Sequence, residues 1–389
     1  MRFRLVLLLL GLFLLVASYP VNASPIYVRF NTNIGNMDVE LFDDTVHNTV
    51  ANFMSYVNNG SYNNLIINRS LPGFVFQAGE YVLVSNSSGY SLGANTPGNP
   101  VASQESVQGA HSNTRGTIAF ALSGGNPNSA TNQWFFNEVD NNSASAPANL
   151  DSQGFTAFGI VMNTSSLSVM DAISNVPVFV PPDDNPFITP AVYAADPNAA
   201  NNTPPGPSPD DFAFGRVPLI NYTLGDDANP NTVLSSNWVV VSSITTLTNV
   251  QDFPTWQTAK FGSTTDPNVI GPTANPAKDG IPNLLKYVFD ISNPLGSMKA
   301  ADCANLPIAG TTTIGTTQYL TLTYHQHNAL VGVTVNVQTS PDLQIWTTVS
   351  NPVFVQTGTD SNNDPIIQAQ VPVNTSETQQ FIRLNVTQP

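Results

Sequence analysis

Arg69 is the residue whose type and surroundings most clearly suggest chemistry. It begins the segment RSLPGFVFQAGE, in which a Leu-Pro-Gly turn leads into an apolar run. A guanidinium stays protonated and offers five N–H donors, so beside an apolar wall it can stabilise charge that develops during a reaction. Arg69 is therefore a candidate catalytic residue; the alternative is an arginine that only braces a sheet. Between positions 24 and 250 there is no lysine, and the arginines are Arg29, Arg69, Arg115 and Arg216.

Two later segments contain the other residues that could contribute to a site. NTRGTIAFALSGGNPNSATNQWFFN (113–137) and LDSQGFTAFGIV (150–161) combine short apolar runs with Gly- and Asn-rich turns. Ser123, His111 and Asp151 could suggest a catalytic triad, but no nucleophile elbow surrounds the serine. The Gly/Asn-rich loop also lacks the lysine and helix start of a phosphate-binding loop. Nucleophilic and phosphate chemistry are therefore disfavoured.

Three blocks in order, INRSLPGFVFQAGE (67–80) and the two segments above, resemble the cyclophilin family of peptidyl-prolyl isomerases, especially its exported bacterial branch. The resemblance covers roughly residues 26–247. It implies a mainly β fold, namely a closed eight-stranded β-barrel capped by two helices. It also implies an enzyme that accelerates X–Pro rotation in unfolded or loop segments of exported proteins and so assists their folding. No cofactor and no metal would be required.

The resemblance assigns a role to each groove position. Arg69 would be catalytic, and Gln77 would bind the substrate backbone and orient Arg69. Aromatic and aliphatic walls would enclose the proline ring, with a small residue on the floor of the groove. Core packing is the alternative interpretation for the aromatic residues. The substrate-binding positions are Phe74, Val75, Gln77, Ala121, Leu122, Phe135, Leu150 and Phe155.

Several of these positions depart from the family pattern. Val75 stands where the family usually has methionine, and Leu122 replaces an asparagine. Phe155 stands where many members have histidine and bacterial ones an aromatic residue. Asn149 lies near the position of the tryptophan associated with cyclosporin binding. We therefore expect weak cyclosporin sensitivity.

The reaction that the resemblance implies places few chemical demands on the protein. The X–Pro bond has a rotation barrier of about 18–20 kcal/mol, because the amide loses its resonance when it is twisted. No bond is broken, so neither a nucleophile nor a metal is needed. An apolar pocket must hold the proline ring, anchors must hold the flanking backbone, and a donor must favour the twisted state over the planar one.

Short apolar runs separated by turns predict the strands and helices of the first part. Helices are expected within 43–60, capped by Asp44 or Thr45, and over 166–176. Residues 178–234 are dense in Pro, Asn and Asp and predict a long insertion with a short ordered piece at 214–224. Gly73, Gly79 and Gly116 are expected at turns or bulges. The expected strands lie in 26–42 (two, with a turn at Ile34-Gly35-Asn36), 65–70, 73–85, 116–124, 132–139, 155–162 and 237–247.

A second unit is predicted for residues 251–389, with two short helices followed by a β-sandwich from about residue 310. NPAKDGIPNLLKY (275–287) is similar to a calcium-loop motif, but Lys286 replaces its closing carboxylate. Because calcium needs six or more oxygens and charge balance, we expect a turn that has lost its metal; weak calcium binding is the alternative. His325 and His327 lack a third ligand nearby in the sequence and are expected to be surface residues.

Composition and the N-terminus favour an exported protein. Only 10% of the 389 residues are charged, and the net charge of −15 argues against a nucleic-acid partner or an anionic membrane. Arg2, Arg4, an apolar stretch and Val21-Asn22-Ala23 predict a signal peptide over 1–23, with a retained anchor as the alternative. The mature chain would be a monomer without a membrane anchor, either periplasmic or secreted to the cell surface. Cys303, the only cysteine, is expected to be a buried or half-buried bystander.

The expected domains are therefore a signal peptide (1–23), an isomerase domain (24–250) and a C-terminal domain (251–389). Two rival functions stay open. The groove could bind proline peptides without turnover, as the changes at Val75, Leu122 and Asn149 would allow. Alternatively, residues 251–389 could supply adhesion or polymer binding, because Trp256 or Trp346 could form an aromatic platform for sugars.

Overall fold

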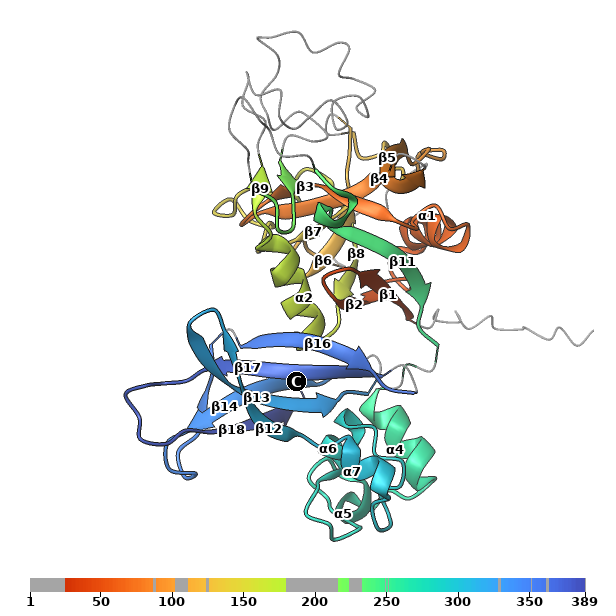
Figure 1. The fold of residues 1–389 in the computed structure, drawn as a ribbon. Helices are drawn as coiled ribbons and strands as arrows, with labels where there is room; N and C mark the ends of the chain where they lie inside the picture. The colour runs from red at the N-terminus through yellow and green to blue at the C-terminus, as the bar shows by residue number, and fades with distance from the viewer. Residues whose placement is uncertain are drawn as a thin grey trace, which may run out of the picture.

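The structure is a computed structural model of the chain. The predicted signal peptide, and the predicted insertion apart from its ends and 216–223, lie outside the described residues. Figure 1 shows the β-barrel of the first half of the chain above the sheets and helices of the second half. The described residues are 25–86, 89–101, 111–123, 126–179, 216–223, 233–248, 250, 252–327, 330–350, 352–361 and 364–388.

Eight strands close into a barrel, as the resemblance implied. Their order is β3-β11-β1-β2-β8-β6-β7-β4, and β4 pairs back with β3 to close the ring. β5 (Gly89–Ala94) pairs only with β4 and forms a hairpin outside the ring. The barrel strands are β1 (Ile26–Thr32), β2 (Asn36–Leu41), β3 (Leu65–Leu71), β4 (Val75–Asn86), β6 (Thr117–Phe120), β7 (Trp134–Asn137), β8 (Ala157–Val161) and β11 (Val240–Thr246).

The barrel interior is filled by aromatic side chains. Phe30 makes edge-to-face contacts with Trp134 and Phe136, at ring-centroid distances of 5.3 Å for both. Phe120 stacks on Phe158 at 4.7 Å. All of these side chains are fully buried, and such contacts add to the free energy of burial. The core therefore fixes the inner face of each strand and leaves the alternate residues for the outside.

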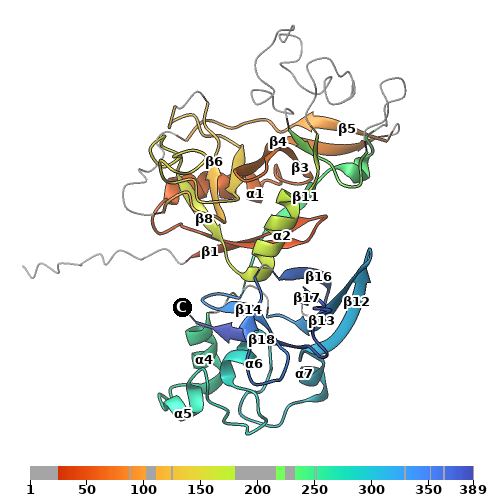
Figure 2. The ribbon, with the colours of Figure 1, turned by 90° about the vertical axis from the view of Figure 1, so that its left-hand side faces the viewer.

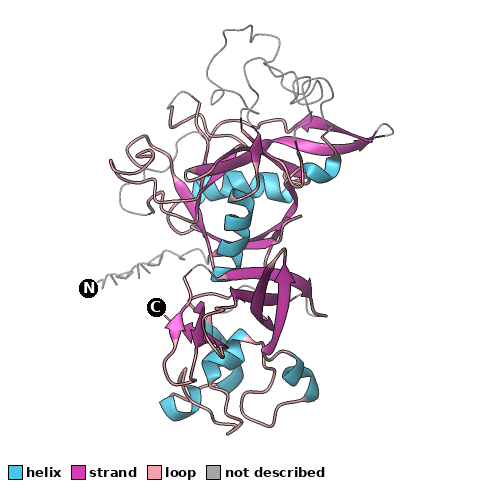
Figure 3. Cartoon of the chain, turned by 60° about the vertical axis from the view of Figure 1, so that its left-hand side comes forward, coloured by secondary structure: helices cyan, strands magenta, loops and turns pink. Residues whose placement is uncertain are grey.

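Two helices cover the barrel, as Figures 2 and 3 show. α1 (His47–Asn58) starts at Val46, without a side-chain cap, so the expected cap by Asp44 or Thr45 is wrong. The preceding carboxylate, Asp43, instead pairs with His47 at 2.9 Å. α2 (Thr164–Ser174) starts at Asn163, whose side chain accepts from the Ser166 N–H. Both helices bury an apolar face in the barrel core.

The described part of the insertion packs against the outside of β3. β9 (Val178–Phe179) pairs with β10 (Val217–Pro218), and the short helix η3 (Ser235–Asn237) leads into β11. The carbonyl of Arg216 accepts from Ser70 N at 2.7 Å. The insertion thus contacts the strand that carries Arg69.

The second half contains four short helices and two sheets with their own apolar core. The sheets have the orders β12-β13-β17-β16 and β15-β14-β18, which confirms the expected sheets of this region. β12, β16 and the helices α5 and α7 were not predicted. The elements are α4 (Phe253–Phe261), α5 (Pro267–Ile270), α6 (Asn283–Val288), α7 (Ala300–Ala304), β12 (Ile308–Ile314), β13 (Thr317–His325), β14 (Thr334–Ser340), β15 (Thr347–Thr348), β16 (Val353–Thr359), β17 (Pro365–Pro372) and β18 (Phe381–Thr387).

The two halves meet at α2, which packs against β16 and β14. At this contact the buried Gln326 Nε2 donates to Ser165 Oγ at 3.0 Å. None of the described helices combines the length and apolar character that crossing a bilayer would require.

Candidate active site

Strand register places the key side chains in one row across the outside of the barrel. Arg69 on β3 lies opposite Gln77 on β4, Gln77 lies opposite Phe135 on β7, and Phe135 lies opposite Ala119 on β6. Side chains that lie opposite each other project from the same face of a sheet. The neighbouring side chains, such as Phe136, point into the core instead. Alternation therefore selects Phe135 from the three consecutive aromatic residues at 134–136.

A bulge directs Arg69 toward this row. Ile67 faces Ala78 in the core, yet Arg69 pairs with the very next residue of β4, Gln77. Two residues of β3 thus oppose one residue of β4, which reverses the face on which the following side chains lie. Without the extra residue at Asn68, strict alternation would place Arg69 on the same face as the buried Ile67. The register therefore accounts for a cation on the outer wall.

The row forms one side of a pocket of about 380 Å³, a size within the usual range of about 300–1,000 Å³ for ligand sites. All nine residues selected from the sequence line this pocket. Sequence reasoning missed six others: Ser123, Ser129, Thr131, Gln133, Ala148 and Gln153. Gln133, two residues before Phe135 on the same face of the chain, could have been found from strand alternation; the rest lie in loops.

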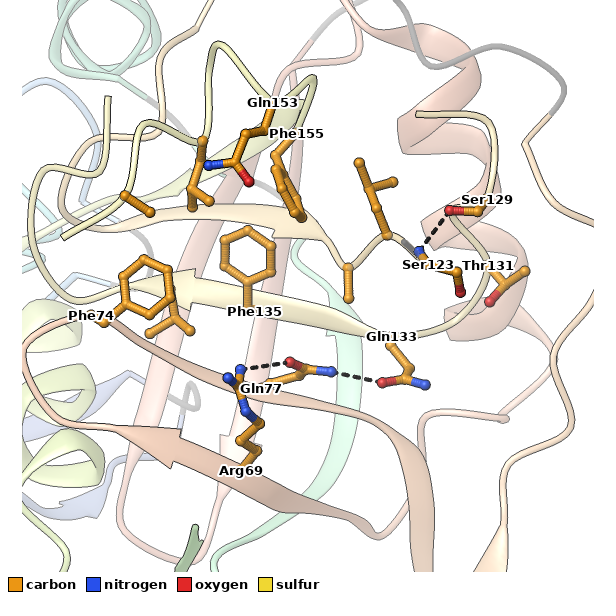
Figure 4. A pocket seen from close by; sticks show the side chains of 15 residues that line it. Arg69, Phe74, Gln77, Ser123, Ser129, Thr131, Gln133, Phe135, Gln153 and Phe155 are labelled. Carbon is orange, nitrogen blue, oxygen red and sulfur yellow. Dashed lines mark hydrogen bonds between the residues drawn. The ribbon is translucent and has the colours of Figure 1, made fainter. Parts of the chain in front are cut away.

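Polar side chains form a chain of hydrogen bonds along one edge of the pocket (Figure 4). Arg69 Nη1 donates to Gln77 Oε1 at 3.4 Å. Gln77 Nε2 donates to Gln133 Oε1 at 2.7 Å, which fixes the orientation of the Gln77 amide. The Arg69 guanidinium is therefore held beside the apolar part of the pocket, on an edge that also carries the Gln77 and Gln133 amides.

Apolar side chains form the rest of the pocket. Phe135 and Leu150 are each 4% exposed and pack with Val75 and Ala119. Phe155 meets Phe135 edge to face, with ring centroids 5.7 Å apart. Figure 4 shows Phe155 on the opposite side of Phe135 from Arg69. The pocket can thus enclose a small apolar ring between the aromatic residues.

The positions that depart from the family pattern also lie at or beside the pocket. Val75 is buried, and Leu122 packs partly against the barrel core while it lines the pocket. Asn149 precedes Leu150 and is half-buried, and its Oδ1 accepts from Ser152 N at 3.1 Å. Val75 and Leu122 therefore keep their part of the pocket apolar, whereas Asn149 places a polar side chain beside it.

Arg29 and Arg115 form ion pairs outside the pocket. Arg29 is buried and makes a two-point contact with Asp38, with nitrogen–oxygen distances of 2.7 and 2.9 Å. Arg115 pairs with Asp171 of α2 at the surface. Arg69 is the arginine that lines the pocket.

Motifs of the second half lie away from the pocket. Lys286 is fully buried and its Nζ lies 2.9 Å from Asp279 Oδ2, so the ammonium group occupies the interior of the calcium-like turn. His327 lies with Asp290 and Asp364, their ligand atoms within 4.8 Å of one another, a grouping that the sequence did not reveal. His325 and His327 are both partly exposed.

The burial of Cys303, Trp256 and Trp346 tests three expectations for the second half. Cys303 is exposed, which corrects its expected burial, because α7 packs through Asp302 instead. Trp256 is 1% exposed and belongs to the core. Trp346 is partly exposed, but the Arg383 guanidinium lies 4.1 Å from its ring centroid and covers one face. Trp256 therefore offers no open aromatic platform, and at Trp346 one ring face is covered.

Comparison with known proteins identifies the family of the first half of the chain. The family described as "Cyclophilin type peptidyl-prolyl cis-trans isomerase/CLD" matches residues 27–192. A peptidyl-prolyl cis-trans isomerase of Acinetobacter baylyi is 34% identical over 150 residues, which are 39% of this chain and 72% of that protein. Peptidyl-prolyl cis-trans isomerase B of Escherichia coli is 33% identical over 150 residues, 38% of this chain and 84% of that protein.

The chain therefore belongs to the cyclophilin-type peptidyl-prolyl cis-trans isomerase family. Its enzyme class is that of the peptidyl-prolyl cis-trans isomerases. The matched region contains every pocket residue named above and ends before the second half begins.

Proposed function

We propose that the pocket accelerates rotation of X–Pro bonds in exported proteins, with Arg69 as the catalytic residue. The proline ring would enter between Phe135, Phe155 and Leu150, which removes its apolar surface from water. Gln77 would hydrogen-bond the flanking backbone on the side of Arg69. Rotation about the bond can then proceed while one side of the peptide stays anchored.

Arg69 would lower the barrier by favouring the twisted bond. When the amide twists, its nitrogen loses conjugation and becomes a better hydrogen-bond acceptor, so a guanidinium N–H stabilises it more than the planar amide. The apolar surroundings strengthen this interaction. The observation that supports this role is the location of Arg69, beside Gln77 and on the same face as Phe135.

We further propose that residues 1–23 direct export and that the chain divides into an isomerase domain, 24–250, and a C-terminal domain, 251–389. Two separate hydrophobic cores support the division, because the described residues of each core come from one side of this boundary. The clients would be X–Pro segments of unfolded or loop regions in the periplasm or at the cell surface. The working form would be a monomer.

The test is prolyl isomerisation of an Ala-Ala-Pro-Phe peptide by the purified protein, beside Arg69→Ala. We expect clear acceleration by the wild type and a loss of about 100-fold or more in the variant, because an electrostatic donor of this kind contributes about 3 kcal/mol. Arg383→Ala is the matched control, since Arg383 lies on β18 outside the pocket, and it should retain full activity. A folded wild type that binds the peptide without accelerating it would indicate a binding module instead.

A further inference from the structure

The turn that carries Phe74 leaves one backbone donor for another part of the chain. Residues 71–74 form a β-turn in which Phe74 N donates to Leu71 O at 2.9 Å. Pro72 occupies the second position, and Gly73 has φ +79, so the turn is of type II. In this geometry the N–H of Gly73 is not used by the turn itself. Its partner decides how firmly the turn is held.

Glu138 supplies that partner and holds the turn from both sides. Its Oε2 accepts from Gly73 N at 2.7 Å. Its own backbone N–H donates to Phe74 O at 2.9 Å. Asn141 Nδ2 donates to the same Phe74 carbonyl at 3.1 Å. The segment just after β7 therefore holds the Pro72–Gly73 and Phe74–Val75 peptide groups. These two groups bracket the backbone that carries Phe74, a wall of the pocket.

The carboxylate occupies an unfavourable place for a charge. Glu138 is only 8% exposed, and burial raises its pKa, partly opposed by the Gly73 N–H, the Ser174 hydroxyl and the Phe74 N–H. Asp171 on α2 raises the pKa further, although Arg115 pairs with Asp171 at 2.6 Å. Burying a carboxylate beside another acid costs free energy. The strong, charge-assisted bond to Gly73 offsets part of that cost.

From these contacts we propose that Glu138 is a positioning residue of the isomerase, which holds Phe74 and the β3–β4 connection in the geometry that the pocket requires. The connection joins Arg69 to Gln77, so a loose turn would move the wall and the donor relative to each other. A small misplacement of a positioning group is costly in catalysis. This inference rests on the proposed function, because Phe74 matters only if the pocket binds proline.

The ionised form of Glu138 makes the stronger hydrogen bond to the Gly73 N–H. A protonated carboxyl group is a weaker acceptor than a carboxylate. Because the pKa of Glu138 is raised, lowering the pH from neutral into the weakly acidic range should weaken the bond to Gly73. The wild type should then lose kcat/KM on acidification. In Glu138→Gln the amide oxygen accepts at any pH, so this loss of kcat/KM at acidic pH (the acidic limb of the profile) should disappear.

The experiment uses the full chain with Glu138→Ala and Glu138→Gln. Glu40→Gln is the matched control, because burial also raises the pKa of Glu40, which lies on β2 outside the pocket. The readouts are kcat/KM on an X–Pro peptide across pH and hydrogen exchange at the Gly73 amide without substrate. We expect Glu138→Ala to lower kcat/KM about tenfold, as loss of one charge-assisted hydrogen bond predicts, and to expose the Gly73 amide to exchange.

Glu138→Gln should keep most of the activity at neutral pH and lose the acidic limb, and Glu40→Gln should behave as the wild type. The proposal is overturned if Glu138→Ala stays within twofold of an active wild type. If Glu138→Ala does not fold, persistence of the acidic limb in Glu138→Gln overturns it instead. An inactive wild type would contradict the proposed function. A Gly73 amide that stays protected from exchange in a folded Glu138→Ala protein would contradict the role of Glu138 in holding the turn.

Discussion

Arg69 and Gln77 lie opposite each other on β3 and β4, and the guanidinium donates to the Gln77 amide oxygen across 3.4 Å. Gln77 is held in turn by Gln133 at 2.7 Å. The guanidinium therefore has a preferred direction before a substrate arrives. Donors that are oriented in advance avoid reorganisation during the reaction, which is the main source of electrostatic catalysis.

Gln77→Ala should lower kcat/KM by about 10- to 100-fold, because it removes both a substrate anchor and the partner of Arg69. The measurement is prolyl isomerisation by the folded variant, with Gln356→Ala of β16 as a control that should have no effect. A double-mutant cycle with Arg69→Ala should show less than additive losses, as expected for residues in contact. Additive losses would show that the two side chains act independently.

Asn149→Trp should increase cyclosporin inhibition, which we expect to be weak in the wild type. The position precedes Leu150 of the pocket wall, so a large ring there would extend the apolar surface next to the groove. The measurement is the inhibition constant of both proteins in the isomerase assay. Equal, tight inhibition of the wild type would contradict the resemblance-based expectation.

Lys286→Met should destabilise the second half by about 3 kcal/mol or more, because it leaves the Asp279 carboxylate without its ammonium partner. The measurement is urea unfolding, with Lys260→Met as the control. Lys260 is partly exposed at the end of α4, and among its described hydrogen bonds it contacts only the Ser292 carbonyl. If Lys260→Met lowered the free energy of unfolding as much as Lys286→Met, the buried ion pair would not be the cause of the destabilisation.

Calcium should leave the wild-type unfolding temperature unchanged if the ammonium group of Lys286 occupies the calcium-like turn. A ligand that binds only the folded state must raise this temperature. A clear rise in millimolar calcium, absent in magnesium, would instead support the weak calcium site that the motif left open.

Asp302→Asn should lower stability by about 1 kcal/mol at neutral pH, with a smaller loss in acid. Burial alone would raise the pKa of Asp302, but hydrogen bonds from Ser292 and the Lys299 backbone lower it below its ordinary value of 3.8. A depressed pKa contributes stability that is present above 3.8 and is lost as the pH falls through the folded pKa. Thermal unfolding across pH, with Glu377→Gln as an exposed control, measures the difference. A pH-independent difference would show that the charge of Asp302 does not contribute.

Much of the site could be predicted because its residues lie in short, ordered blocks. Phe74, Gln77 and Phe135 match groove positions of the family in residue type, and all three line the pocket. The barrel strands were predicted because their apolar runs are dense, whereas β5, β9 and β10 were not predicted. β12 was missed because its sequence, IAGTTTI, is mostly exposed and lacks a clear alternation. β16, VFVQTGT, was missed for the same reason.

Other features depended on contacts that no local pattern reveals. Glu138 contacts Gly73 across 65 positions, and no sequence pattern links the two residues. His327 is brought to Asp290 and Asp364 only by the packing of three segments. Such groupings follow from which elements pack together, and composition or periodicity carries no information about that.

The sequence by itself determined the residue types of the groove and the mainly β character of the chain, because alternation and turn residues act over a few positions. The tertiary structure decided which face each residue occupies. The bulge at Asn68 places Arg69 on the outer wall, although alternation alone would align it with the buried Ile67. The physical reason is that side-chain direction in a strand depends on pairing register, and the bulge that shifts this register arises only where β3 pairs with β4.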